Sequence, residues 1–127
     1  MIIAPTVMEE TAGQNCIFCN IVSRDAAATY VYDDDKIIGI KDANPQAPVH
    51  VLLIPREHNL ESLNDMSKLD VQLMGHLLYV AAKVANQLDI AESGYRVVIN
   101  TGEAAGQSVP HLHAHLLGGR SLAWPPG

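Results

Sequence analysis

The 127-residue chain is poor in basic residues, in aromatic side chains and in cysteine. Eight Lys and Arg residues stand against 14 Asp and Glu residues, which gives a formal net charge of −6. This balance argues against a groove for nucleic acid polymers, because such a groove needs a basic face, although a few local donors suffice to hold one phosphate. No stretch approaches the roughly 18 apolar residues of a membrane-spanning helix, so we expect no membrane partner.

The amino-terminal segment also lacks the features of a signal peptide. Residues 1–14 have no positively charged start, and they carry acids where a signal peptide is apolar. They show no hydrophobic periodicity either. We therefore expect a flexible extension over residues 1–14, one domain over residues 15–127 and a cytoplasmic location.

The two cysteines are too few for the disulfide framework of a secreted domain. Cys16 and Cys19 are separated by two residues, a spacing that in a reducing compartment indicates a metal site or a redox pair. A redox pair favours a strand-to-helix setting and basic surroundings, and the sequence near these cysteines indicates neither. Two thiolates together with two imidazoles would form a closed tetrahedral zinc site.

A row of histidines near the end of the chain is the strongest functional signal. His111, His113 and His115 alternate with small or apolar residues, a period of two that predicts a strand with one core face and one functional face. Pro110 suits the first residue of such a strand. Neighbouring histidines would stand roughly 6.6 Å apart, so without a bulge we expect them to have different roles. Three imidazoles on one face are costly to bury without partners, which favours function over core packing.

The residues before this row add hydrogen-bond donors. Gly106, Gln107 and Ser108 supply flexible backbone and polar side chains, and together with the histidines they indicate a phosphate or oxyanion site beside a nitrogen nucleophile. His113 has a histidine on each side and lies near the donors, so it is the natural nucleophile, and at a reference pKa of about 6.5 it is largely neutral at pH 7. A histidine pair of this spacing also binds catalytic zinc in other proteins, and that alternative stays open.

The remaining pattern predicts a mixture of helices and strands. Ser67 and Asp70 resemble a capping box, and apolar residues then recur at three and four positions, so we expect a helix of about 22 residues from Ser67 to near Leu88 with His76 on its outer side and without a function. The other expected elements are a short helical segment over 16–23, a hairpin of strands 29–32 and 36–41 around a solvated acidic turn 33–35, and strands over 50–55 and 95–100.

The segment from Gly106 to Gly119, with the histidine row inside it and Trp-Pro-Pro-Gly at the chain end, resembles the histidine triad (HIT) family. The closer resemblance is to its nucleotide-binding HINT branch, and it extends from Cys16 onward. It implies an α+β fold with a five-stranded antiparallel sheet, one long and one short helix, and a homodimer that joins two sheets into one of ten strands. The tail with Trp124 would pack on the body or across that dimer interface.

The resemblance also implies a reaction. His113 would attack the α-phosphate of a purine nucleoside phosphoramidate or another adenylated compound, form a nucleotidyl-histidine and release AMP on hydrolysis. That chemistry needs no metal, so zinc would be structural. The bound partner would be an AMP- or GMP-type purine nucleotide. Alternatives are a dinucleoside polyphosphate hydrolase, a non-catalytic nucleotide- or protein-binding module, and a three-histidine metal enzyme; the related transferase branch is much longer than this chain.

Roles for individual residues follow from the same resemblance. By this resemblance Asp42 would bind the ribose diol, although the sequence alone favours a turn cap at this position, and His50 would orient a triad ring or be a half-exposed strand-end histidine. Pro110, Ile40 and Ala43 depart from the family pattern, which leaves base preference open. The implied nucleotide-binding residues are Ile17, Phe18, Asp42, Asn100, Gly106, Gln107, Ser108, Val109 and His115, and the implied zinc ligands are Cys16, Cys19, His58 and His111.

Overall fold

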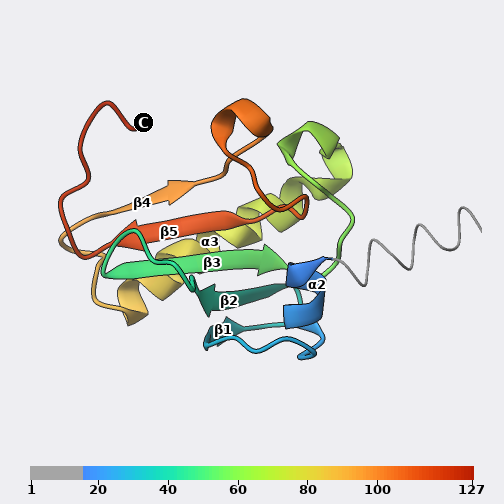
Figure 1. Ribbon diagram of the computed structural model, residues 1–127, viewed down its shortest axis with the longest axis horizontal. Coiled ribbons are helices and arrows are strands. Elements are labelled where there is room, and N and C mark those ends of the chain that lie inside the picture. Colours follow the sequence, from blue (N-terminus) through green and yellow to red (C-terminus); the bar gives the residue numbers. More distant parts are fainter. Residues whose placement is uncertain (1–15) are drawn as a thin grey trace, which may run out of the picture.

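The computed structural model describes residues 16–127, so the extension expected over residues 1–14 lies outside the described part. Five strands form one antiparallel sheet in the order β1-β2-β3-β5-β4, and the long helix α3 (Val71–Gln87) crosses one face (Figure 1). The short helix α2 (Ile17–Val22) packs on the opposite face. The strands are β1 (Tyr30–Asp33), β2 (Ile37–Lys41), β3 (Val49–Pro55), β4 (Tyr95–Val98) and β5 (Ala114–Gly118). The predicted α+β fold is confirmed.

Side chains alternate between two cores because successive residues of a strand point to opposite faces. On β3, Val51 and Leu53 pack against α3, whereas Leu52 and Ile54 pack against α2. This explains the apolar runs 37–40 in β2 and 51–55 in β3: both of their faces are covered, and Lys41 at the end of β2 is the exposed residue of the two strands. Among the described residues, no helix has the length and apolar character needed to span a membrane.

The long helix begins later than its sequence pattern predicts. The capping box at Ser67 and Asp70 is present, but it closes a separate 3₁₀ turn, and α3 then runs for 17 residues from Val71. The apolar pattern also includes Val71 and Leu78 in the buried stripe, but these side chains are 61% and 53% exposed. The buried stripe consists of Leu77, Val80, Ala81, Val84 and Ala85.

The histidine segment also differs from a simple strand. Hydrogen-bonded pairing in β5 begins at Ala114, so His111 and His113 precede it. The backbone between these two histidines is held by a loop instead, because the Leu112 amide donates to the carbonyl of Leu60 at 2.9 Å. The alternation nevertheless persists, with Ala114 and Leu116 buried in the α3 core. The three histidines therefore come from an extended approach to β5 and from β5 itself.

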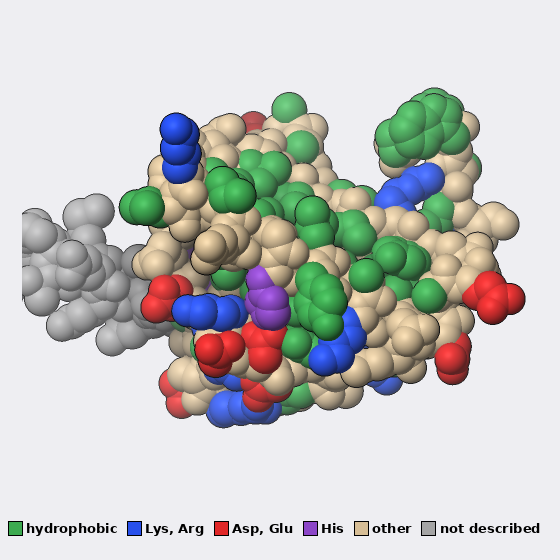
Figure 2. All heavy atoms as spheres, turned by 180° about the vertical axis from the view of Figure 1, so that it is seen from behind, with side chains coloured by type: hydrophobic (Ala, Val, Ile, Leu, Met, Phe, Trp, Pro, Cys, Tyr) green, Lys and Arg blue, Asp and Glu red, His purple; other side chains and the backbone are tan. Residues whose placement is uncertain are grey.

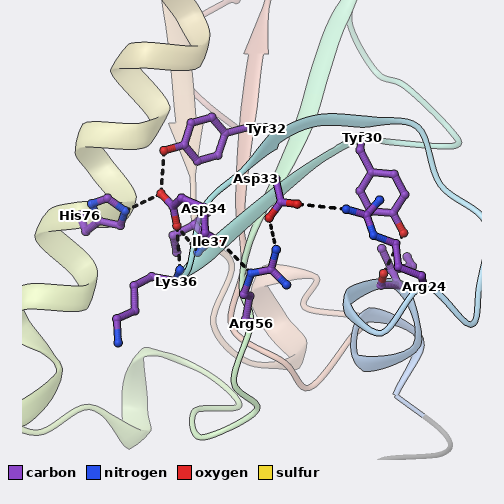
Figure 3. Close-up of polar contacts among 10 residues, drawn as sticks. Arg24, Tyr30, Tyr32, Asp33, Asp34, Lys36, Ile37, Arg56 and His76 are labelled. Atoms are coloured by element: carbon purple, nitrogen blue, oxygen red, sulfur yellow. Dashed lines mark hydrogen bonds and ion pairs between the residues drawn. The ribbon is translucent and has the colours of Figure 1, made fainter.

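The acidic turn is not merely solvated, as Figure 3 shows. The carboxylate of Asp34 accepts hydrogen bonds from Tyr32 Oη, from the amides of Lys36 and Ile37, and from His76 Nε2 on α3. Burial alone would raise the pKa of Asp34, but these donors outweigh it and hold that pKa well below its ordinary value. The network ties the β1–β2 hairpin to α3 and gives His76 a structural partner.

The carboxyl-terminal tail leaves β5 and runs past β4 (Figure 1). Arg96 of β4 donates to the carbonyl oxygens of Leu122 and Ala123, which fixes the tail to that edge of the sheet. Trp124 is 80% exposed, with the Arg96 guanidinium 5.9 Å from its ring centroid. The tail is thus tied to the body through its backbone, while its largest side chain stays in solvent.

Candidate active site and metal centre

The functional face of the sheet is formed where β3 and β5 pair. Leu52 lies opposite His115, and His50 lies opposite Leu117, so that the antiparallel register brings His50 and His115 together on the α2 side. His113 and His111 continue the same face beyond the start of β5, where both rings are buried. Phe18 of α2 packs edge-on against the His113 ring, with centroids 4.8 Å apart.

His113 is held with a free lone pair. Its Nδ1 donates to the carbonyl oxygen of His111 at 2.7 Å, and a neutral imidazole that donates through Nδ1 carries its lone pair on Nε2. Burial lowers the pKa of His113 below the ordinary histidine value, although the hydrogen bond to His111 opposes the shift. The ring is therefore uncharged at neutral pH and keeps the Nε2 lone pair that a nucleophile would need.

His115 is held in the opposite tautomer. The Gln46 amide donates to His50 Nδ1 at 3.0 Å, so the proton of a neutral His50 lies on Nε2. That Nε2 stands 2.9 Å from His115 Nδ1 and 3.3 Å from Asp42 Oδ2. Because His115 Nδ1 accepts this proton, its own N–H lies on Nε2. Burial, followed by the neighbouring His113 and His50, lowers the pKa of His115 to about 4. Neighbouring rings thus offer a lone pair and an N–H donor.

A pocket of about 740 Å³ opens onto these rings, a size within the usual range for small-molecule sites. Its apolar wall includes Ile17, Phe18 and Ile40, and Ala43 also borders it. The polar lining includes Asp42, Ser108, His113 and His115, and Val109 also borders the pocket. The arrangement suits a ligand with a flat apolar part joined to an anionic group.

Three predicted binding residues are not in this lining. The Gln107 side chain accepts from the Gly102 amide at 3.0 Å and donates to the carbonyls of Glu61 and Val109, so it braces the loop. Gly106 ends a 3₁₀ turn with a φ of 87°, and Asn100 is half-buried beyond the end of β4. In this conformation the expected charge stabilisation by the Gln107 amide is not available, because loop groups already use it.

The structure also brings in two groups that the sequence did not indicate. The Gln46 amide fixes the tautomer of His50, and the Arg120 guanidinium donates to the Gln46 carbonyl through Nε at 3.1 Å and Nη2 at 3.0 Å. Gly119, with a φ of 88°, allows the chain to turn closely past Pro48 just before Arg120. Gln46 acts through its backbone, so its residue type carried no signal.

The cysteines meet two histidines beside this pocket. Cys16 Sγ lies 3.3 Å from His111 Nδ1, and Cys19 Sγ lies 3.2 Å from His58 Nδ1. All four ligand atoms fall within 4.8 Å of one another. Burial and the neighbouring Cys16 raise the pKa of the Cys19 thiol to about 12, so this thiol keeps its proton unless a cation replaces it.

The outer nitrogens of the two imidazoles show that this cluster fits zinc. His58 Nε2 donates to the Pro110 carbonyl at 2.7 Å, and His111 Nε2 donates to the Pro55 carbonyl at 2.8 Å. Each bond leaves the lone pair on Nδ1, directed at the thiols, which is the arrangement of metal-ligating histidines. Two sulfurs and two nitrogens are the donors of a closed structural zinc site.

A second group of ligand atoms, from Asp42, His50 and His115, is equally compact but fits a metal poorly. The amide that donates to His50 Nδ1 places the imidazole proton on Nε2, the atom that would have to coordinate the ion. Within residues 16–127, the three triad histidines do not form a common ligand group either. This geometry disfavours the three-histidine metal enzyme.

Comparisons with known proteins agree with these features. A family model described as "HIT domain" matches residues 23–122. The "14 kDa zinc-binding protein" of Zea mays is 47% identical over 112 residues, 87% of either chain, and the "Adenylylsulfatase HINT1" of Arabidopsis thaliana is 46% identical over 87% of this chain and 76% of its own. The crystal structure of a HIT family hydrolase from Legionella pneumophila superposes with a TM-score of 0.86 at 43% identity, covering 89% of this chain and all of that one.

Proposed function

This chain belongs to the HIT family, and on that premise we propose that it is a nucleotide hydrolase which cleaves purine nucleoside phosphoramidates or similar adenylated compounds and releases AMP. The observation that carries the proposal is the pair of opposite tautomers in the polar lining of the pocket. His113 offers a lone pair beside the N–H of His115, which is what an attack on a phosphoryl group requires.

The pocket divides naturally into subsites for a nucleoside monophosphate. The base packs against the apolar wall of Ile17, Phe18 and Ile40. Asp42 receives the ribose hydroxyls; its Oδ1 accepts from the Asn44 amide, and the carboxylate retains further lone pairs for the diol. The phosphate lies between His113, His115 and Ser108.

In the first step, His113 Nε2 donates its lone pair to the α-phosphorus and forms a P–N bond. The bond from phosphorus to the leaving nitrogen breaks, and the departing amine takes up a proton from solvent or from a histidine of the site. The modified ring is cationic, and its Nδ1–H points at the His111 carbonyl, whose dipole stabilises that charge. His115 Nε2–H donates to a phosphate oxygen throughout.

In the second step, water attacks the phosphorus and gives up a proton to solvent, and the P–Nε2 bond breaks, which returns the electron pair to His113 and frees AMP. Division of one displacement into two is the usual advantage of a covalent intermediate. No metal takes part. When zinc is bound by Cys16, Cys19, His58 and His111, it supplies a closed tetrahedral crosslink.

Turnover of adenosine phosphoramidate tests the proposal. Wild-type protein should release AMP, and His113→Ala should bind AMP without turnover. Diadenosine polyphosphates and adenylyl sulfate, the latter suggested by the name of the Arabidopsis relative, should be hydrolysed more slowly. Faster hydrolysis of a diadenosine polyphosphate would favour that alternative, and AMP affinity without any turnover would indicate a binding module.

We further propose that the protein is a homodimer joined through β4. Among residues 16–127, this strand is a sheet edge that pairs with β5 alone, and an edge without a second partner favours pairing with another strand. Hydrophobic side chains also gather across the middle of the α3 face (Figure 2), and Leu78 and Tyr79 are among the exposed ones. Sedimentation at micromolar concentration should give the mass of two chains, and a monomer at all concentrations would contradict this arrangement.

A further inference from the structure

The candidate metal site and the proposed active site share one residue, His111. The side chain of His111 lies in the metal cluster, with Nδ1 3.3 Å from Cys16 Sγ and 3.6 Å from Cys19 Sγ. The backbone carbonyl of His111 accepts the hydrogen bond that fixes the tautomer of His113. Metal ligation that holds the His111 side chain therefore also limits the movement of the His111 carbonyl, and this carbonyl determines where the His113 lone pair points.

A second connection passes through α2. Phe18 stands between the two cysteines in sequence, and its ring packs edge-on against both His113, at 4.8 Å, and His111, at 5.9 Å. The helix has only six residues and buries only Phe18 and Ile21, so it has few contacts of its own. Cys16 also accepts the Cys19 amide at 3.3 Å and thereby caps the helix. The position of the Phe18 ring thus depends on where the two thiols are held.

We propose that the Cys16–Cys19–His58–His111 metal site is a positioning device for His113, which couples metal occupancy to the catalytic competence of the neighbouring pocket. The proposal rests on the proposed function, because it takes His113 as the nucleophile. Ligation through His111 Nδ1 holds the His111 carbonyl, and ligation through the thiols holds Phe18 against the His113 ring. Both supports act on orientation rather than on charge.

The coupling should affect turnover more than binding. His115 is positioned by His50 rather than by the metal ligands, and the Asp42 carboxylate lies 3.3 Å from the same nitrogen of His50. Loss of the metal should therefore lower kcat by about tenfold or more, as is typical when an outer support of a site is removed, while AMP affinity falls by a smaller factor.

Direct observation of the His113 tautomer provides a test that does not depend on activity. Protein with ¹⁵N-labelled imidazoles is compared by long-range proton–nitrogen NMR in its zinc-loaded state and after removal of zinc by a chelator. We expect His113 to be a single Nδ1–H tautomer with zinc and a mixture without it. If the chelated protein stays folded with His113 in the same single tautomer and with kcat unchanged, the proposal is overturned.

A matched pair of variants keeps the test decisive if the chelated protein unfolds. His58→Gln and His111→Gln each remove one metal ligand while keeping an amide that can donate to the same carbonyl, Pro110 or Pro55. At saturating zinc, His111→Gln should lower kcat by about tenfold and mix the His113 tautomers, because residue 111 carries the carbonyl; His58→Gln should have a clearly smaller effect. Wild-type kcat together with a single His113 tautomer in folded His111→Gln would overturn the coupling.

The two proposals fail in distinguishable ways. If zinc-loaded wild-type protein turns over none of the adenylated substrates but its His113 tautomer still responds to zinc, the proposed function fails and the coupling stands. If turnover depends on His113 but neither kcat nor the tautomer responds to zinc, the coupling fails and the proposed function stands.

Discussion

Replacement of His50 by leucine should impair the reaction although His50 does not face the phosphate. His50 is 7% exposed, and it passes a hydrogen bond from the Gln46 amide to His115 Nδ1 at 2.9 Å. Without that donor, His115 Nδ1 has lost its hydrogen bond in a half-buried site, and the imidazole proton of His115 can then lie on Nδ1 instead of Nε2. The tautomer with an N–H directed at the phosphate is then no longer favoured.

The expected magnitude follows from the loss of one hydrogen bond at a buried group. Such a loss costs about 1–3 kcal/mol, which corresponds to a decrease in kcat/KM of roughly 5- to 150-fold. The effect should appear mainly in kcat if the His115 N–H is worth more in the transition state than in the bound substrate.

Hydrolysis of adenosine phosphoramidate by His50→Leu and His50→Gln provides the assay and its control. A glutamine amide can donate to His115 Nδ1 in place of the imidazole, so His50→Gln should recover most of the lost activity. Unfolding midpoints should be measured for both variants, because a common loss of fold would mimic the effect. Turnover by folded His50→Leu equal to that of the wild type would refute the role given to this hydrogen bond.

Three further predictions concern pH, the tail and the hairpin. Because burial lowers the pKa of His113 below the ordinary histidine value of 6.5, its lone pair stays free at more acidic pH, so the acid-side loss of kcat/KM should be centred below pH 6.5, and a loss centred near 6.5 would contradict this. Arg120→Ala removes the two hydrogen bonds that hold the Gln46 carbonyl, so it should lower kcat/KM several-fold. Steady-state kinetics should show this loss relative to the control variant Arg24→Ala, and equal kcat/KM values for the two variants would contradict the prediction. Asp34→Asn should lower the free energy of unfolding by about 1–3 kcal/mol, because four donors lose a charged acceptor. Asp33→Asn, at a more exposed ion pair, should lower it by less than about 1 kcal/mol. Urea unfolding at pH 7 compares the two variants, and the difference between them should vanish as the pH falls and the Asp34 carboxyl takes up its proton.

Much of the fold could be predicted because burial leaves a periodic record in the sequence. Leu77, Val80, Ala81 and Val84 form the stripe that marks α3, and the continuous apolar runs mark β2 and β3. Element ends were less predictable. The capping box at Ser67 closes a 3₁₀ turn, and β5 begins only at Ala114, because in both places the deciding hydrogen bonds are made locally or by loops.

The site could be predicted in its residue types but not in its proton arrangement. Cysteine and histidine indicate their chemistry through their side chains, and the structure places Cys16, Cys19, His58 and His111 together. The tautomers of His50 and His115 depend on a backbone amide at position 46, and the sequence contains no sign of that contact or of the clamp from Arg120, 74 positions away.

Gln107 shows the same limitation. An amide side chain near a phosphate-binding loop can stabilise substrate charge or brace the loop, and both roles use the same donors. The choice depends on the loop conformation, which places the Glu61 and Val109 carbonyls within reach of this side chain. Residue type alone could not decide between them.

The most direct test of the account is a search for the covalent intermediate. Wild-type protein is mixed with adenosine phosphoramidate, quenched on the millisecond scale under alkaline conditions that preserve phosphorus–nitrogen bonds, and digested for mass spectrometry. We predict an adenylyl group on the peptide that contains His113, localised to that residue by fragmentation and absent in His113→Ala. An adduct on His111 or His115, or rapid AMP release with no adduct at any time, would contradict it.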